Sequence, residues 1–201
     1  MRPGRARQDR GFTLVELMVT VAMIIVLVIV TIPPVMKAVR EREVADAAQA
    51  VMDILDFAKV QAAARNRAYQ VVPTLTTGQW GPGKQGTIQL NEGPSSACIN
   101  FASGVQNVRR LDFGQDYESV HLVSVTPADI VQATICIKPD GRVLRVDTQM
   151  PVASSDTQYA AGDVRFVVQR YEHGPTVSNG PVGIQHVIVL PYNGAARHTW
   201  Q

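Results

Sequence analysis

The most unusual chemical setting in the sequence belongs to Glu16. It is the only ionisable residue in the 21-residue segment from Phe12 to Ile32, whose other residues are uncharged and mostly apolar. With a rise of about 1.5 Å per residue, a helix of this length reaches the ~30 Å thickness of a hydrocarbon core. A carboxylate there costs about 2.5–3.5 kcal/mol on insertion scales. Glu16 therefore either has a function within the segment or extends its carboxylate to the lipid headgroups.

A second motif has the spacing of a phosphate-binding loop. Gly78 to Lys84 reads Gly-Gln-Trp-Gly-Pro-Gly-Lys. The next residue is Gln85, so the hydroxyl that such loops place on Mg²⁺ is missing. Pro82 also removes one of the backbone amides that would bind phosphate, and no helix pattern follows. The motif therefore gives no expectation of nucleotide binding.

The histidines and serines show no catalytic or metal-binding pattern. His121, His173, His186 and His198 have no partner four residues away and no acidic neighbour at ligand spacing. The sequence holds no Gly-x-Ser-x-Gly. His121 and His186 alternate with other residues in strand-like runs, so we expect both to face outward. We expect no enzyme activity, no metal site and no cofactor.

Two short stretches are candidates for nucleic-acid contact. One is Arg109 with Arg110, and the other is the tail, with Arg197, His198 and Trp200. Cations beside an aromatic ring suit phosphate contact and base stacking. A solvated, frayed terminus is the competing interpretation of the tail. The net charge is +2 overall, but beyond the first eleven residues 15 basic residues face 16 acidic ones. Overall charge thus gives no support for a nucleic-acid partner and does not exclude one.

The segment that holds Glu16 follows a basic stretch. This basic stretch, residues 1–11, contains four arginines and one aspartate: Arg2, Arg5, Arg7, Arg10 and Asp9. The positive-inside rule places this stretch in the cytoplasm and exports the rest. A cleaved secretory signal is the alternative, but its apolar run is usually 7–15 residues and ends at a small-residue cleavage site. Here the run is longer and ends in Ile32-Pro33-Pro34.

The two cysteines, Cys98 and Cys136, both lie in the exported part. An oxidising compartment permits a disulfide between them, which would contribute about 3–4 kcal/mol of stability. Two free buried thiols are the alternative.

The rest of the chain divides into a helix and a series of strands. From Val44 to Ala62 apolar residues recur every three or four positions, which predicts an amphipathic helix to about Arg67, bent or loosened at Pro33 and Pro34. After Tyr69, short β-type runs alternate with turn residues. The predicted strands are YQVVP, GTIQL, CINF, VRRLDF, SVHLVSV, ATICIKP, RVLRV, DVRFVVQR and GIQHVIVL, with a tight turn at Pro139-Asp140-Gly141.

The sequence RGFTLVELMVTVAMIIVLV, from Arg10, resembles the N-terminus of type IV pilin-like proteins. Downstream, DILDFAKVQAAARNRAYQVV is similar to the end of the long helix in the GspH/FimT family. ICIKPDGRVLRV is similar to that family's strand, Pro-Asp-Gly turn and strand. Residues 74 to 130 hold no further match to the family.

This resemblance implies processing and assembly. A prepilin peptidase would cleave between Gly11 and Phe12 and methylate the new amine of Phe12. Glu16 would then pair with the amine on Phe12 of a neighbouring subunit, which offsets the cost of placing a carboxylate near lipid. The implied partners are other major and minor pseudopilins, the peptidase and an inner-membrane assembly platform.

The sequence and the resemblance together predict an α+β protein. We expect a leader at 1–11, a transmembrane helix at 12–32, its amphipathic continuation at 33–67, and a periplasmic antiparallel β domain at 68–201, built as a two-sheet sandwich. The expected function is that of a structural minor pseudopilin, anchored in a bacterial inner membrane with a cytoplasmic N-terminus, in a type II secretion-type system. The alternative is a FimT-like minor pilin acting in pilus priming or DNA uptake.

Overall fold

A computed structural model describes residues 13–75, 80–81, 83–98, 105–117, 119–126, 133–147, 159–160, 164–172, 181–191 and 195–200. The chain forms two compact units, Met1–Val39 and Arg40–Gln201. Helix α1, Leu14–Arg65, contributes residues to both units and is helical through Pro33 and Pro34. The remaining elements follow α1 and belong to the second unit.

The second part of α1 packs one face into the core. The buried face that the sequence predicts from Val44 to Ala62 is confirmed, and both Ile54 and Leu55 belong to it. Four of its residues are alanines, which permit close approach of the helix backbone: Ala47, Ala48, Ala58 and Ala62. The expected opposite face is exposed at Asp46 and Asp53.

Helix α1 ends at Arg65, two residues before the predicted end. Asn66 takes a positive φ of 51°, and the amide of Arg67 donates to the carbonyl of Ala62 over 3.3 Å. This is the Schellman arrangement, in which asparagine substitutes for the usual glycine. It turns the chain at once into the first strand.

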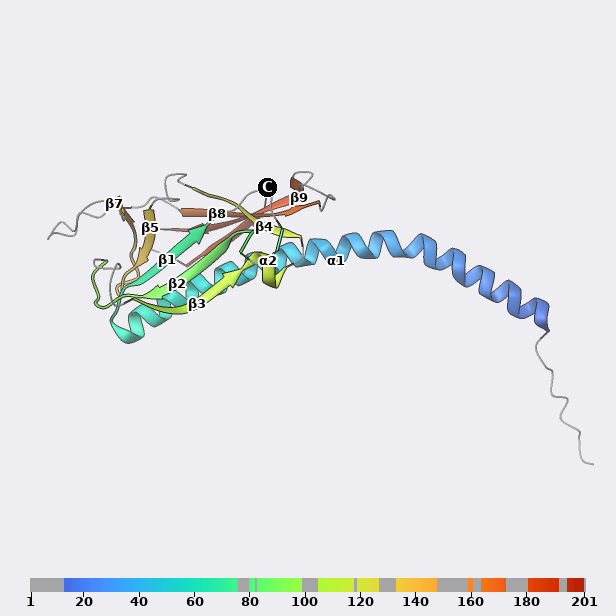
Figure 1. The fold of residues 1–201 in the computed structure, drawn as a ribbon, viewed down its shortest axis with the longest axis horizontal. Coiled ribbons are helices and arrows are strands. Elements are labelled where there is room, and N and C mark those ends of the chain that lie inside the picture. Colours follow the sequence, from blue (N-terminus) through green and yellow to red (C-terminus); the bar gives the residue numbers. More distant parts are fainter. Residues whose placement is uncertain are drawn as a thin grey trace, which may run out of the picture. The chain divides into compact units, whose positions relative to one another are not determined.

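Among the described residues, the strands form two antiparallel sheets (Figure 1). The six-stranded sheet has the order β3-β2-β1-β5-β6-β7, and the four-stranded sheet has the order β10-β9-β8-β4. The strands of the first sheet are β1 (Tyr69–Thr74), β2 (Thr87–Glu92), β3 (Gln106–Asp112), β5 (Ala133–Ile137), β6 (Val143–Asp147) and β7 (Tyr159–Ala160). Those of the second are β4 (Val120–Thr126), β8 (Val164–Tyr171), β9 (Pro181–Leu190) and β10 (Arg197–Trp200), and a short helix α2 (Phe113–Asp116) lies between β3 and β4.

A single buried cluster joins α1 to both sheets. It contains Leu55 from the helix, Leu90 from the six-stranded sheet and Phe166 from the four-stranded sheet, all almost without exposed surface. A helix and two antiparallel sheets around one core make this an α+β fold, as the sequence predicts. The core holds both sheets, whose edge strands β3, β4 and β10 carry candidate residues of the β domain.

Most predicted strands are found, with three additional elements and one difference at a predicted strand. β7, β10 and α2 were not expected from the sequence pattern. Cys98 is not in a strand, and the rest of the predicted CINF strand lies outside the described residues. The Pro139-Asp140-Gly141 turn is present, with Gly141 at a φ of 82° and its amide donating to the carbonyl of Lys138.

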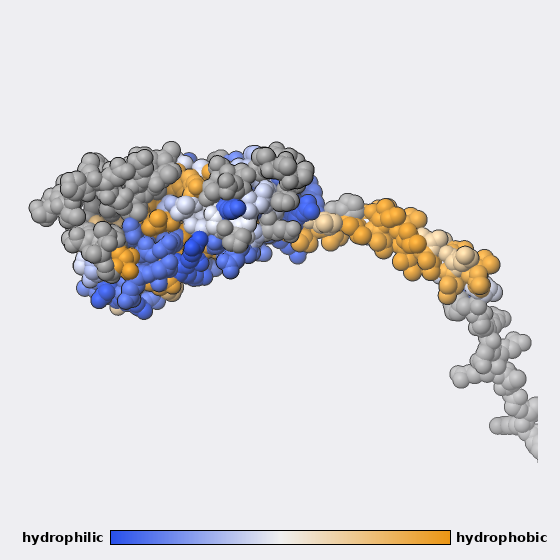
Figure 2. All heavy atoms as spheres, in the orientation of Figure 1, coloured by the Kyte–Doolittle hydropathy of each residue, from blue (hydrophilic) through white to orange (hydrophobic). Residues whose placement is uncertain are grey.

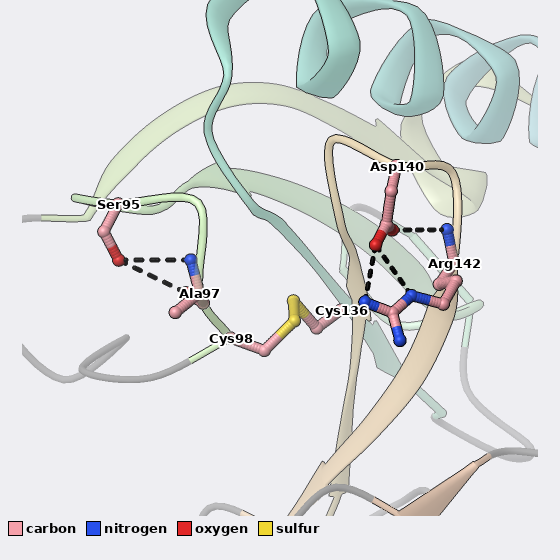
Figure 3. Close-up of a disulfide and its surroundings, with 6 residues drawn as sticks. All are labelled: Ser95, Ala97, Cys98, Cys136, Asp140 and Arg142. Atoms are coloured by element: carbon pink, nitrogen blue, oxygen red, sulfur yellow. Dashed lines mark hydrogen bonds and ion pairs between the residues drawn. A yellow bond between two sulfur atoms is a disulfide. The ribbon is translucent and has the colours of Figure 1, made fainter. Parts of the chain in front are cut away.

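A disulfide joins Cys98 to Cys136 of β5, with the two Cα atoms 5.9 Å apart (Figure 3). That separation lies in the ordinary range for a disulfide. Both cysteines are buried beside Ala68 and Leu144, in a second small apolar cluster. The bond connects the segment after β2 to the centre of the six-stranded sheet.

A buried carboxylate holds the end of α1 against β2. Glu92 is 6% exposed and accepts hydrogen bonds from Nη1 of Arg65 at 2.6 Å and from the hydroxyl of Tyr69 at 2.9 Å. Burial and this hydrogen bond to Glu92 raise the pKa of Tyr69 above its ordinary value. The tyrosine therefore remains a neutral donor to the carboxylate.

Glu92→Leu is expected to lower the free energy of unfolding by about 2–3 kcal/mol, because the buried Tyr69 hydroxyl loses its acceptor. Glu92→Gln retains an acceptor and should cost about 1 kcal/mol. The control is Asp140→Asn, which weakens an ion pair with Arg142 in which both side chains are about half exposed; it should cost under about 1 kcal/mol. Equal losses for Glu92→Leu and Asp140→Asn in denaturant titrations would contradict this account.

Candidate functional site

The first candidate site is the N-terminal part of α1. The side chains of residues 13–32 and 34–42 are exposed. Figure 2 shows the stretch toward the N-terminus of α1 as an almost continuous run of hydrophobic residues, and after Glu16 the next charged residue is Lys37. By length and composition this stretch is able to cross a membrane. Glu16 lies in the first turn of the helix. Gly11 and Phe12, the predicted processing residues, lie outside the described residues.

The first turn of the helix around Glu16 carries a cap that the sequence analysis did not predict. The backbone amide of Glu16 donates to the hydroxyl of Thr13 over 3.2 Å, which makes Thr13 the N-cap and Glu16 the third residue of the helix. Thr-x-x-Glu is the sequence pattern of a capping box, in which the third helical residue is glutamate or glutamine. The carboxylate charge also suits the positive end of the helix dipole. Helix capping is thus a second explanation for Glu16, and it makes no use of a partner subunit.

The packed part of α1 is tied to β4 where it enters the second unit. Ser119 donates to Glu43 twice, from its amide to Oε1 at 3.2 Å and from its hydroxyl to Oε2 at 3.0 Å. The carbonyl of Ser119 accepts from the amide of Tyr171. Glu43 therefore links the helix to a hydrogen-bonded pair of strands, so the buried helix face and this contact together resist sliding of the helix against the sheets.

The Gly78-to-Lys84 motif contacts a carboxylate of the chain itself. The amide of Gly83 donates to Oδ1 of Asp112 over 2.8 Å. The same oxygen accepts the amide of Gly114, so Asp112 also caps α2. The motif is followed by β2 rather than by a helix. The amide of Gly83 is therefore already bound by a carboxylate of the chain.

His121, expected as an outward-facing strand residue, is not exposed to solvent but buried. His121 is 2% exposed, because Trp80 covers it edge-on with ring centroids 4.8 Å apart, and the Tyr171 ring lies 4.6 Å away on β8. Its Nε2 lies 3.5 Å from Nε2 of Gln85. Burial lowers the pKa of His121 to about 4, so the ring is neutral at pH 7. The alternation of residue types along a strand predicts which face of the sheet a side chain is on. It does not predict that a loop from elsewhere in the chain will cover that face.

His121 should make folding sensitive to acid. The unfolded state binds a proton near pH 6.5 and the folded state only near 4. Between these values the unfolded state holds more protons, so stability falls as pH falls. The contribution of His121 is fully present above pH 6.5 and is lost by pH 4, a difference of about 3 kcal/mol.

Unfolding by denaturant at pH 7.5 and at pH 4.5, for the native chain and for His121→Gln, measures this contribution. The native chain should lose about 2–3 kcal/mol more than the variant. His186→Gln is the matched control for a half-buried histidine and should leave most of the pH dependence in place. The account fails if His121→Gln retains the full pH dependence.

The basic residues proposed for nucleic-acid contact lie at two separate edges. Arg109 and Arg110 are on β3, at the edge of the six-stranded sheet. The Arg109 guanidinium lies 5.7 Å from the ring centroid of Phe57 on α1, and Arg110 pairs with Asp112 at 3.2 Å. Both side chains therefore have partners within the domain, although they remain exposed.

The tail is a strand, so its interpretation as a frayed terminus is wrong. Arg197, His198 and Trp200 belong to β10, which pairs with β9 at the other edge of the four-stranded sheet from β4. Helix α2 contacts both β3 and β4. Within the four-stranded sheet, β4 and β10 are the two edges, about 14 Å apart by three strand spacings, and the arginines of β3 belong to the other sheet. The five residues do not form one patch.

The β10 strand brings two histidines together. Nδ1 of His186 on β9 lies 2.8 Å from Nε2 of His198, and the two rings are stacked with an interplanar angle of 13°. The ring of His198 meets that of Trp200 edge-on. Burial, and then the neighbouring His198, lower the pKa of His186. Sequence spacing could not reveal this pair, because only the β9–β10 register makes the two residues neighbours.

No group of three or more histidine, cysteine, aspartate or glutamate side chains is arranged to hold a metal in the described part of the chain. Comparisons of the chain with protein-family models, with curated proteins and with solved structures find no match. The function is therefore argued from the residues and their geometry.

Proposed function

We propose that the protein is a structural minor pseudopilin, a subunit of a short periplasmic filament in a type II secretion-type system. The observation that supports this proposal best is the division of α1 into two different parts. One continuous helix has an exposed, membrane-length apolar part with a carboxylate in its first turn, and a second part whose apolar face is buried in a β domain. This division suits a subunit that is stored in a membrane and later extracted into a filament.

In this proposal a prepilin peptidase cleaves between Gly11 and Phe12 and methylates the amine of Phe12. The basic leader stays in the cytoplasm, and the β domain, a two-sheet sandwich, lies in the periplasm. The disulfide between Cys98 and Cys136 supports export, because such bonds persist in oxidising compartments.

Assembly would use Glu16 as the contact that sets register. A carboxylate near lipid is costly, and the cationic amine of Phe12 on a neighbouring subunit would offset that cost. Removal of the apolar segment from lipid is compensated when the same segments pack together in the filament. A separate cytoplasmic motor would supply the ATP hydrolysis.

The test is a strain that lacks the protein. Its culture supernatant is assayed for lost exported proteins, alongside transformability and surface motility. The proposal expects lost secretion with normal DNA uptake, restored by the native gene. Normal secretion with lost uptake or motility would replace it with the second candidate.

The second candidate is a FimT-like minor pilin that acts in pilus priming or DNA uptake. It is favoured by β10, where Trp200 is 71% exposed and Arg197 is exposed on the same edge strand. Electrophoretic titration of DNA with the detergent-solubilised chain at two salt concentrations tests it. DNA uptake requires salt-dependent binding that Arg197→Gln and Trp200→Ala both weaken. No such binding at tens of micromolar protein would remove this candidate.

A further inference from the structure

We propose that His186 and His198 form a binding site for a divalent transition-metal ion of the copper or nickel type. The site lies on the exposed edge of the four-stranded sheet and is independent of the filament proposal. Its two ligands are Nδ1 of His186 and Nε2 of His198, which lie 2.8 Å apart and already face each other in a hydrogen bond.

The distance between these nitrogens fits one coordination geometry better than another. With metal–nitrogen bonds of about 2.0–2.1 Å, two neighbouring ligands of a square-planar ion lie about 2.9 Å apart, and those of a tetrahedral ion about 3.3 Å apart. The observed 2.8 Å is close to the square-planar value, although it is now the length of a hydrogen bond that lies along the line between the two nitrogens. Imidazole nitrogens suit both Cu²⁺ and Ni²⁺, for which square-planar sites are common. To bind either ion, the two nitrogens can keep their separation, but the rings must turn so that both lone pairs point at the metal.

The protonation of the pair also suits a metal. A hydrogen bond between two ring nitrogens requires that at least one of them is an unprotonated acceptor. Metal binding requires both facing nitrogens to be unprotonated. In the donor ring the proton moves to its other nitrogen through solvent, so both rings stay neutral and no net proton is released.

The backbone holds the two ligands at this separation. In the β9–β10 ladder His186 is opposite Trp200, and His198 is opposite Ile188, so the two histidines are diagonal neighbours on the same face of the sheet. Ile188, opposite His198 in this ladder, is fully buried. Two ligands fixed on paired strands lose little conformational freedom on binding. Water would occupy the other positions on the ion.

The test uses the detergent-solubilised full chain without a polyhistidine tag, titrated with Ni²⁺ by calorimetry. One site per chain is expected, and His186→Gln and His198→Gln should each weaken it at least tenfold. The double variant should bind no more weakly than either single variant, because one imidazole alone makes no chelate. Arg197→Gln, on the same strand but without a ligand nitrogen, should bind as the native chain does.

A second measurement does not depend on the stability of the variants. Electron paramagnetic resonance of the native chain with one equivalent of Cu²⁺ should show two equatorial imidazole nitrogens. Ni²⁺ should also quench the fluorescence of Trp200, which neighbours His198, and His198→Gln should abolish that quenching. The proposal is overturned if the double variant binds Ni²⁺ as tightly as the native chain, or if the Cu²⁺ spectrum shows fewer than two imidazole ligands.

Discussion

Glu16→Gln should leave the chain processed and inserted in the membrane but greatly reduce its incorporation into filaments. Glutamine retains the size of the side chain and can occupy the glutamate position of a capping box, so its local cost is limited to the charge at the helix N-terminus, about 0.3–1 kcal/mol. It loses the negative charge that the proposed contact with the Phe12 amine requires. We expect incorporation to fall about tenfold or more, which corresponds to a loss of about 1.4 kcal/mol or more per contact. Crosslinking and recovery of sheared filaments measure it.

Thr13→Ala is the matched control, because it removes the hydroxyl that accepts the Glu16 amide and leaves the carboxylate in place. The loss of such a cap costs about 0.5–2 kcal/mol of helix stability. If Glu16 acts through its charge, Thr13→Ala should assemble well and Glu16→Gln poorly. If Thr13→Ala instead assembles poorly and Glu16→Gln assembles well, helix capping explains Glu16. That result would contradict the proposed contact between Glu16 and the Phe12 amine.

Removing the disulfide should produce the largest loss of stability. Cys98 and Cys136 are separated by 38 positions, and opening a loop of that size lowers the free energy of unfolding by about 4 kcal/mol in the chain-entropy model. The double variant Cys98→Ser/Cys136→Ser should therefore melt about 8–16 °C below the native chain. Thermal unfolding followed by circular dichroism measures the difference.

The reductant supplies the control for this prediction. Native protein treated with a reductant should melt at about the temperature of the double variant, and the double variant should not respond to the reductant. A native melting temperature that the reductant leaves unchanged, together with two titratable thiols in the unfolded oxidised protein, would contradict the disulfide.

The elements that the sequence predicts well are those with a strong local pattern. The buried face of α1 follows from its repeat of three and four residues, and most strands follow from β-type runs between turn residues. β10 was missed because Arg-His-Thr-Trp is short and has no apolar alternation. Its strand structure depends on pairing with β9, a contact that the local sequence does not encode.

The candidate functional residues also differ in whether their setting depends on the local sequence or on long-range packing. The setting of Glu16 is local, so the sequence alone identifies it. The burial of His121 depends on Trp80, which is 41 positions away in sequence, and the meeting of His186 with His198 depends on strand register. Asp112 could not be linked to Gly83 from spacing, because they meet through a loop and a strand edge. Long-range packing, rather than residue type, decided these cases.

The most direct test of the central claim is the intact mass of the protein purified from its native membrane. The account predicts a chain that begins at Phe12, lacks residues 1–11 and is one methyl group heavier than the cleaved sequence. Fragmentation should place that methyl group on the amine of Phe12. A mature chain that retains residues 1–11 would contradict the proposed processing, and with it the assignment to a pilin-like filament.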